Sequence, residues 1–233
     1  MNPHLAEIFF QVVVFLFAIS VHESAHAYVA WRCGDPTAYM LGRVTLNPLP
    51  HIDPWMSILL PALLWFLSGG RFTFGGAKPV PVNSRKFRNY RKGDILVSAA
   101  GVTTNLILAL VWSCVFVLLG VLARSFPGMT ALFDTAQRMM VYGIWLNLIL
   151  CFFNLIPVPP LDGSHLLYHA LPPRIGSWYR NLQRFGYLPI FALMFLFRPA
   201  IAFLLTPAYK GMAVLLRLIL PFSVGDGWNI FQS

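Results

Sequence analysis

Residues 94–123 read DILVSAAGVTTNLILALVWSCVFVLLGVLA, which is the longest apolar run in the chain and the clearest indication of its fold class. It exceeds the ~20 residues that an α-helix needs to cross the hydrocarbon core of a bilayer. The whole chain of 233 residues is 58% hydrophobic and 11% charged, whereas an ordinary soluble domain is roughly 25% charged. A water-soluble globule is therefore excluded. We expect residues 1–233 to form a single membrane domain.

Other apolar runs indicate further helices. Residues 5–31 lack the basic start and the small-residue cleavage site of a signal peptide, so we interpret them as a retained helix. Residues 136–156 form another run, and residues 187–205 and 211–222 are two pieces separated by Thr206-Pro207. The sequence thus predicts an all-α polytopic membrane protein with about 4–6 membrane segments.

The run at residues 55–68 is too short for a crossing. It has 14 residues, follows Pro54 and contains Pro61. This length suits a re-entrant segment, which enters and leaves the membrane on the same side. The Gly- and Pro-rich stretches beside it carry two short β-like loop segments, Arg43–Leu46 and Arg71–Phe74, for which we expect a small hairpin or an extended loop.

The positive charge of the chain reports topology. The net charge is +9, but the 17 Lys and Arg residues are spread through the loops and form no single basic face. We therefore expect no nucleic acid as a partner. A basic cluster lies before the longest apolar run and marks a cytoplasmic loop; it consists of Arg85, Lys86, Arg88, Arg91 and Lys92.

The chemistry is concentrated in His22-Glu23-Ser24-Ala25-His26, inside the first apolar run. Two imidazoles at i and i+4 lie on the same face of a helix, where both can bind one metal ion. The Glu beside the first His is then positioned to take a proton from the attacking water. Unpaired His and Glu at membrane depth are costly, so this pattern predicts a zinc site rather than a coincidence.

Two His leave a tetrahedral zinc one protein ligand short, and Asp162 is the leading candidate for the third. It follows Pro157, Pro159 and Pro160, which prevent regular helix and can turn the chain back toward the site. Zinc, two neutral His and the carboxylates of Glu23 and Asp162 sum to zero charge, which suits a buried site. Asp162 could also simply begin a turn. The rival ligands are His165, the strongest of them, His169 and His51.

Two asparagines in the apolar runs are further candidates. The amides of Asn154 and Asn105 could hold substrate or stabilise an oxyanion, or they could bond neighbouring helices. For Asn147 we expect packing.

These motifs resemble those of the bacterial site-2 proteases, zinc metalloproteases that cut substrates within the membrane. Besides the His22–His26 motif, the resemblance is carried by Asn154–Gly163 (NLIPVPPLDG), Asn47–Pro54 (NPLPHIDP), Ala77–Asn83 (AKPVPVN) and the small-residue segment that ends in Asn105. The loop motifs indicate the compact subgroup without a PDZ domain. The family usually has Gly-Pro before the membrane Asn, where this chain has Gly101-Val102.

The resemblance implies that His22, His26 and Asp162 bind one zinc ion, that Glu23 is the catalytic acid and base, and that Asn154 helps to hold substrate or the oxyanion. It also implies a multi-pass protein of a bacterial inner membrane. The partners would be a transmembrane protein substrate, the lipid bilayer and any accessory regulators, which the sequence does not name. An unwound substrate segment could pair with residues 41–46 or 71–74.

The alternative is a non-enzymatic membrane metal-binding protein or a metal transporter that uses the same His pair. A transporter would be expected to show polar residues along several helices or two matching halves, and neither is evident.

The zinc ligands also constrain the topology. Both His lie near the end of the first helix, and Asp162 follows the end of the helix at residues 136–156, so these two helix ends must share a side of the membrane. With the basic cluster in the cytoplasm, that side is the cytoplasmic one. The segment at 55–68 must then enter and leave on the same side.

Overall fold

The fold is almost entirely helical. The computed structural model describes residues 3–69, 75–225 and 228, and this part of the chain contains no β-strand. Four of its helices are long and apolar enough to cross a membrane: Phe9–Cys33, Tyr90–Ser125, Pro127–Asn154 and Arg198–Phe222. The prediction of an all-α polytopic membrane protein is confirmed.

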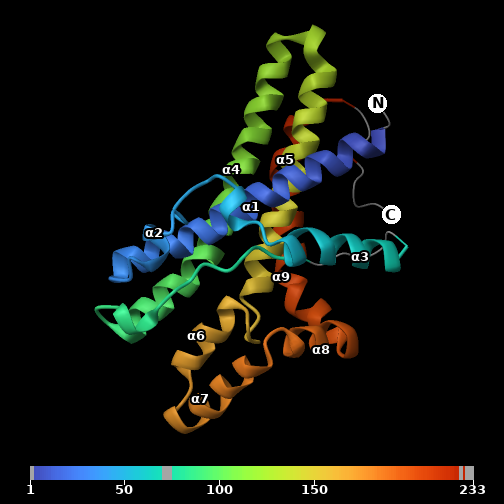
Figure 1. The fold of residues 1–233 in the computed structure, drawn as a ribbon. Helices are drawn as coiled ribbons and strands as arrows, with labels where there is room; N and C mark the ends of the chain where they lie inside the picture. The colour runs from blue at the N-terminus through green and yellow to red at the C-terminus, as the bar shows by residue number, and fades with distance from the viewer. Residues whose placement is uncertain (1–2, 70–74, 226–227, 229–233) are drawn as a thin grey trace.

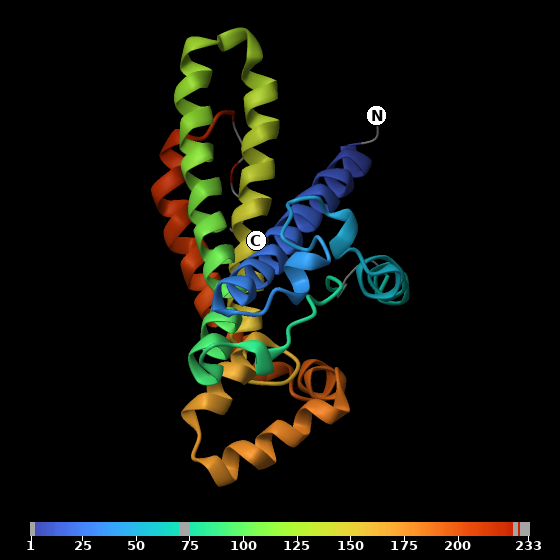
Figure 2. The same ribbon diagram turned by 60° about the vertical axis from the view of Figure 1, so that its left-hand side comes forward.

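Three of the long helices form an upright bundle (Figures 1 and 2). Helix α4 (Tyr90–Ser125) and helix α5 (Thr130–Asn154) are antiparallel and joined by a short 3₁₀ turn at Pro127–Met129, and α9 (Arg198–Ile219) packs mainly against α5. The core of the bundle consists of apolar side chains from all three helices, including Phe116, Ile144, Leu148, Met212 and Leu216.

Helix α1 (Pro3–Cys33) crosses the α4–α5 pair obliquely (Figure 2). Its buried residues include the small Ala18, Ala27 and Ala30, which allow close approach of two helix backbones. A one-turn helix, α2 (Thr37–Met40), follows it. This crossing brings the His22–His26 motif against the first half of α4, at Val97, Gly101 and Asn105.

The segment after α1 contains helix only in short pieces. Residues Pro54–Leu59 form a π-helical turn that continues into α3 (Leu60–Leu67), and the carboxylate of Asp53 caps the start. The chain then comes back to this start: the Gly76 N–H donates to the Met56 carbonyl (2.9 Å), and Ser57 Oγ donates to the Gly76 carbonyl (2.6 Å). The chain after α3 thus returns to the start of the 14-residue apolar helix, which agrees with the re-entrant prediction.

Of the two forms expected at Arg43–Leu46, a small hairpin or an extended loop, the hairpin is wrong. This stretch forms a loop with bends, which side-chain bonds tie to neighbouring segments. The guanidinium of Arg43 donates to the Pro50 and Pro79 carbonyls, and the imidazole of His51 bonds the Thr45 carbonyl. The second β-prone piece, Arg71–Phe74, lies outside the described residues.

Three short helices extend from the lower end of the bundle (Figure 1): α6 (Asp162–Ala170), α7 (Pro173–Arg180) and α8 (Leu188–Leu196). The break expected at Thr206-Pro207 is wrong, because Pro207 lies inside α9. The chain breaks instead at Phe197, between α8 and α9, and Pro199 fits the first turn of α9, which needs no N–H there.

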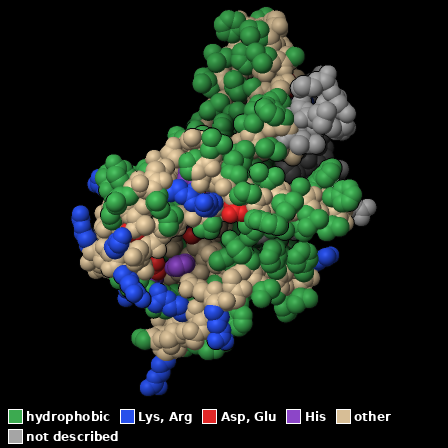
Figure 3. Space-filling model, in the orientation of Figure 1, with side chains coloured by type: hydrophobic (Ala, Val, Ile, Leu, Met, Phe, Trp, Pro, Cys, Tyr) green, Lys and Arg blue, Asp and Glu red, His purple; other side chains and the backbone are tan. Residues whose placement is uncertain are grey.

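The surface agrees with a membrane protein. Figure 3 shows apolar side chains over α3 and the upper part of α4 and α5, whereas Lys and Arg gather toward the lower end, where α1 ends and α4 begins. Many of the exposed side chains are large and apolar, among them Trp55, Phe66, Leu118 and Phe203. Such exposure is costly in water but ordinary in lipid.

Candidate metal centre

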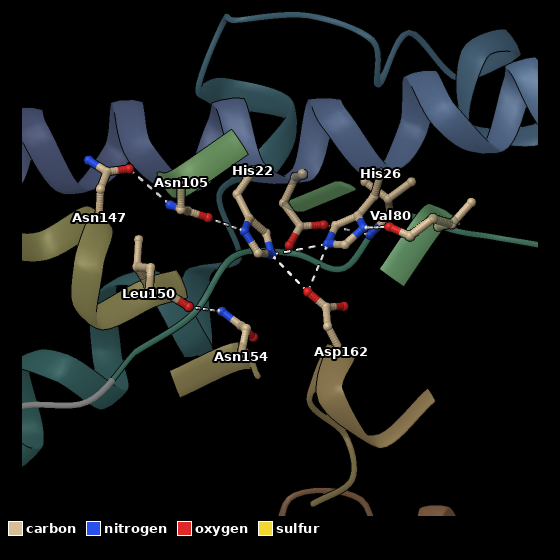
Figure 4. A network of polar contacts seen from close by, with 10 residues as sticks. His22, His26, Val80, Asn105, Asn147, Leu150, Asn154 and Asp162 are labelled. Atoms are coloured by element: carbon tan, nitrogen blue, oxygen red, sulfur yellow. Dashed lines mark hydrogen bonds and ion pairs between the residues drawn. The ribbon is translucent and has the colours of Figure 1, made fainter. Parts of the chain in front are cut away.

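His22 and His26 converge on one point beside α4. They are one turn apart on α1, both are buried, and their Nε2 atoms are 3.0 Å from each other (Figure 4). The predicted placement of the two imidazoles on one face of the helix is therefore confirmed. It presents two imidazole nitrogens to a common position.

Asp162 completes the cluster from a different part of the chain. It is the first residue of α6, and its Oδ2 lies 3.5 Å from His22 Nε2 and 3.3 Å from His26 Nε2. The three donor atoms lie within 4.8 Å of one another, and no other group of three His, Cys, Asp or Glu in the described part of the chain meets this condition.

The three donors fit a zinc ion. Tetrahedral ligands at zinc bond lengths of ~2.0–2.1 Å are about 3.3 Å apart, and the separations here are 3.0, 3.3 and 3.5 Å. Asp162 Oδ2 is buried and accepts no hydrogen bond, so it is free to ligate. Burial alone would raise the pKa of Asp162, but the adjacent imidazoles of His26 and His22 hold this pKa well below its usual range, which keeps the carboxylate ionised.

Two glycines allow the backbones to come this close. A Cβ at Gly101 of α4 would lie 2.5 Å from both His22 Cε1 and His26 Nε2. A Cβ at Gly163, beside Asp162, would lie 2.2 Å from the Leu155 carbonyl oxygen, against which α6 begins. Only glycine fits at either position.

The far side of each imidazole is held by a hydrogen bond. His26 Nδ1 bonds the Val97 carbonyl (2.7 Å), which can only accept, so Nδ1 carries the proton and Nε2 is left as a metal ligand. His22 Nδ1 bonds the Asn105 side-chain oxygen in the same way. Such bonds fix the ring orientation of a metal-binding His and raise its basicity.

The Asn105 amide is itself hydrogen-bonded to a side chain of α5. Its Nδ2 donates to Asn147 Oδ1 (2.9 Å), and Asn147 Nδ2 donates to the Gly143 carbonyl (2.8 Å); both amides are fully buried. Both ends of Asn105 are thus engaged, which favours a positioning role over the expected contact with substrate or oxyanion. We expected only packing for Asn147, and its spacing of seven residues from Asn154, which puts both on one helix face, was the available signal.

Glu23 lies beside the ligands and is half-buried. Its Oε2 accepts a hydrogen bond from the backbone N–H of Val80 (3.0 Å). Val80 belongs to the extended segment Gly75–Asn83, which the sequence did not connect with the carboxylate. The Lys78 N–H of this segment donates to the His51 carbonyl (2.8 Å), which fixes the segment beside the site.

Asp35 holds the other end of this segment. Its buried carboxylate accepts from the Asn83 N–H (2.6 Å) and the Thr37 hydroxyl and lies 3.8 Å from Lys86 Nζ. Burial would raise the pKa of Asp35, but these hydrogen bonds and the Lys86 charge hold the pKa below its usual value. Part of the basic cluster therefore serves as an anchor for the segment that contacts Glu23.

Asn154 lies at the end of α5, near the cluster (Figure 4). Its Nδ2 donates to the Leu150 carbonyl (2.9 Å). The amide nitrogen has a second N–H, which is the group that an oxyanion would use. The side chain is half-buried, so substrate could reach it.

None of the three rival His residues joins the cluster. His165 and His169 bond Asp94 instead, and His51 Nε2 bonds the Thr45 carbonyl (3.1 Å). Burial and the nearby charge of Arg43 lower the pKa of His51, which makes it a neutral structural residue in its loop.

The chain is similar to one family model and to several proteins named as zinc metalloproteases. The profile of Peptidase family M50 matches residues 10–197. A Bacillus subtilis protein named as zinc metalloprotease YwhC is 39% identical over 186 residues, which cover 79% of this chain and 78% of that protein. Proteins named as zinc metalloprotease Rip2, from Mycolicibacterium smegmatis and Mycobacterium tuberculosis, are 33% identical over 77% and 73% of this chain and over 64% and 59% of their own length. No solved structure gives a significant match.

Proposed function

The chain belongs to Peptidase family M50, the site-2 protease family, and on this premise we propose that His22, His26 and Asp162 hold the zinc of its active site while Glu23 is the catalytic acid and base. The protein is a zinc metalloprotease of the membrane, whose substrates are membrane-embedded. The alternative function, metal binding or transport without catalysis, is not favoured.

One observation carries the assignment of the residues. Three donor atoms from α1 and α6 converge at separations that suit tetrahedral zinc. They do so although 135 residues lie between His26 and Asp162 in the sequence. A carboxylate that is not one of them, Glu23, stands next to the first ligand. This is the arrangement that metal-assisted hydrolysis needs.

Zinc at this position supplies Lewis acidity toward water and toward the scissile carbonyl. Glu23 accepts a proton from the attacking water as the water oxygen bonds to the carbonyl carbon. The same carboxyl returns the proton to the amide nitrogen as the C–N bond breaks, which leaves a carboxylic acid and an amine. The Val80 N–H holds one oxygen of Glu23 and leaves the other to exchange the proton.

The substrate must unwind locally, because the carbonyl groups of an intact helix are hydrogen-bonded and shielded. The second N–H of Asn154 is available to the oxyanion or to the exposed substrate backbone. Pairing of substrate with residues 41–46 is not supported, because that stretch forms bends. Pairing of substrate with residues 71–74 stays a hypothesis, because these residues lie outside the described part of the chain.

We propose that the active site lies near the cytoplasmic side of a bacterial inner membrane. The support is the basic cluster of residues 85–92 at the start of α4, on the same end of the molecule as α6 (Figure 1). In a helix of 36 residues, about 54 Å long at 1.5 Å per residue, the first turns extend past a hydrocarbon core of ~30 Å.

Substitution of Glu23 tests this function. Glu23→Gln should retain zinc, because the residue is not a ligand, and should abolish cleavage, because an amide cannot accept the proton. The matched control is Glu7→Gln, at the only other glutamate of the chain. Zinc content is measured on purified protein, and uncleaved membrane proteins that accumulate in cells carrying each variant are identified by proteomics. Cleavage at the wild-type rate by Glu23→Gln would refute the mechanism, and a transporter would keep its function in that variant.

A further inference from the structure

A second cluster of titratable side chains lies outside the metal centre, between α4 and α6. The carboxylate of Asp94, in the second turn of α4, is buried, and its Oδ2 bonds His169 Nε2 (2.7 Å) and His165 Nδ1 (3.3 Å). The His169 side chain is also buried, whereas His165 is one-third exposed. Neither imidazole belongs to the zinc site, and the mechanism uses none of the three groups.

The spacing along α6 connects this cluster to the metal centre. Asp162, His165 and His169 are separated by three and then four residues, so they lie along one face of the helix in consecutive turns. Helix α4 is the main packing partner of α6. Asp162, in the first turn of α6, therefore lies beside His22 and His26. His165 and His169, in the next two turns, both bond the carboxylate of Asp94 on α4.

Helix α6 is too short to hold its position by its own helical bonds. It has nine residues, and isolated helices of this length are marginal. It follows a loop with Pro157, Pro159 and Pro160, in which regular helical bonds are lost. A ligand at the first residue of such a helix needs support from elsewhere.

The bond between Asp94 and His169 is the best supported of the contacts. The His169 ring packs edge-on against Tyr90 (5.5 Å between centroids), and the His169 carbonyl accepts from Arg91 Nη2 (3.0 Å). Three residues in the first two turns of α4 therefore hold this one residue near the end of α6.

We propose that Asp94 and His169 form a clamp that sets the position of α6 on α4 and thereby presents Asp162 to His22 and His26. Asp94 and His169 are positioning residues, and His165 adds a weaker second bond to the same carboxylate oxygen. The proposal rests on the proposed role of Asp162 as the third zinc ligand. Loss of the clamp lets α6 shift, and a ligand that is misplaced weakens zinc binding without any loss of a donor atom.

The test is zinc affinity, measured by competition with a chelating dye on purified full-length protein. Asp94→Ala should bind zinc about 10-fold more weakly than wild type, and His169→Ala should give the same loss. Asp94→Asn keeps a side-chain oxygen that accepts from His169 and should retain most of the affinity. The matched control is Asp134→Ala, which removes a carboxylate from an ion pair with Arg138 at the other end of α5 and should leave the affinity unchanged.

A double-mutant cycle separates positioning from general loosening. In an Asp162→Ala background, Asp94→Ala should have no further effect on zinc affinity, because the ligand that the clamp positions is gone. An undiminished loss in that background would refute the clamp, and so would wild-type affinity in both Asp94→Ala and His169→Ala. If Asp94→Ala does not fold, the cycle is run with His169→Ala. Wild-type affinity in Asp162→Ala alone would instead refute the proposed zinc site.

Discussion

Gly101→Ala is the substitution whose effect on the metal centre follows most directly from the structure. The added methyl group would lie 2.5 Å from His22 Cε1 and 2.5 Å from His26 Nε2, whereas ordinary contacts begin at 3.4 Å. The two imidazoles or α4 must therefore move by about 0.9 Å. Because one of the crowded atoms is itself a donor nitrogen, the methyl group also intrudes into the space between the ligands.

The size of the effect follows from the tolerance of metal sites. Zinc–ligand distances vary by only about 0.2 Å, so a displacement of about 0.9 Å exceeds this tolerance several-fold. Loss of one supporting hydrogen bond behind a ligand costs about 10- to 100-fold in metal affinity. Displacement of two ligands should cost at least the upper value, about 2.7 kcal/mol of zinc binding free energy. Alanine favours helix over glycine by about 0.5–1 kcal/mol, so α4 itself should remain helical.

The assay combines zinc affinity with circular dichroism of the purified protein in detergent. Gly211→Ala, in α9, is the matched control, because its methyl group would meet only Leu148, with Cδ2 at 3.7 Å and Cδ1 at 3.8 Å, which are ordinary contacts. Gly101→Ala should keep the helical signal of the control and lose zinc and cleavage. Wild-type zinc affinity in Gly101→Ala would refute the close approach of α4 to the two imidazoles.

Further outcomes follow from the same geometry. Wild-type protein should bind about one zinc per chain, and Asp162→Ala should lower zinc affinity far more than His165→Ala; the reverse order in a chelator titration would overturn the ligand assignment. Asn147→Leu, which breaks the chain of hydrogen bonds behind the first imidazole, should lower zinc affinity about 10-fold, and an unchanged affinity would reduce that chain to packing. Single cysteines at Ser68 and Asn83, in a background without the native cysteines, should not label from opposite sides of the membrane; labelling from opposite sides would show a true crossing in place of a re-entrant segment.

The sequence predicted those features that depend on short-range periodicity. The apolar run at residues 94–123 corresponds to α4, and the run at 136–156 to α5, because helices of this length need only an apolar composition to be recognised. The two imidazoles were expected on one helix face for the same reason. The placement of Asp162 beside them was predicted by a different argument, the need for a third ligand and a carboxylate after prolines that turn the chain.

Other features that depend on contacts between distant segments were not predicted. The Val80 N–H on Glu23 is a backbone group, and any residue except proline could supply it. The Asn105–Asn147 pair joins two helices whose relative rotation no single helix encodes. The break at Phe197 was missed because two prolines lie nearby, and only packing decides which of them starts a helix and which lies within one.

Hydrogen bonding within the site indicates where the chemistry occurs. In a membrane chain, buried polar groups find partners inside the protein because lipid offers none. The outward nitrogens of the two imidazoles meet this rule through Asn105 and the Val97 carbonyl, and Glu23 meets it through a backbone N–H. The inward groups do not: Asp162 Oδ2 accepts no hydrogen bond, and the two Nε2 atoms face each other across 3.0 Å. The outward nitrogens of both imidazoles are bonded while Asp162 Oδ2 and the two Nε2 atoms converge on one point, and a cation is the species that would satisfy all three inward atoms at once.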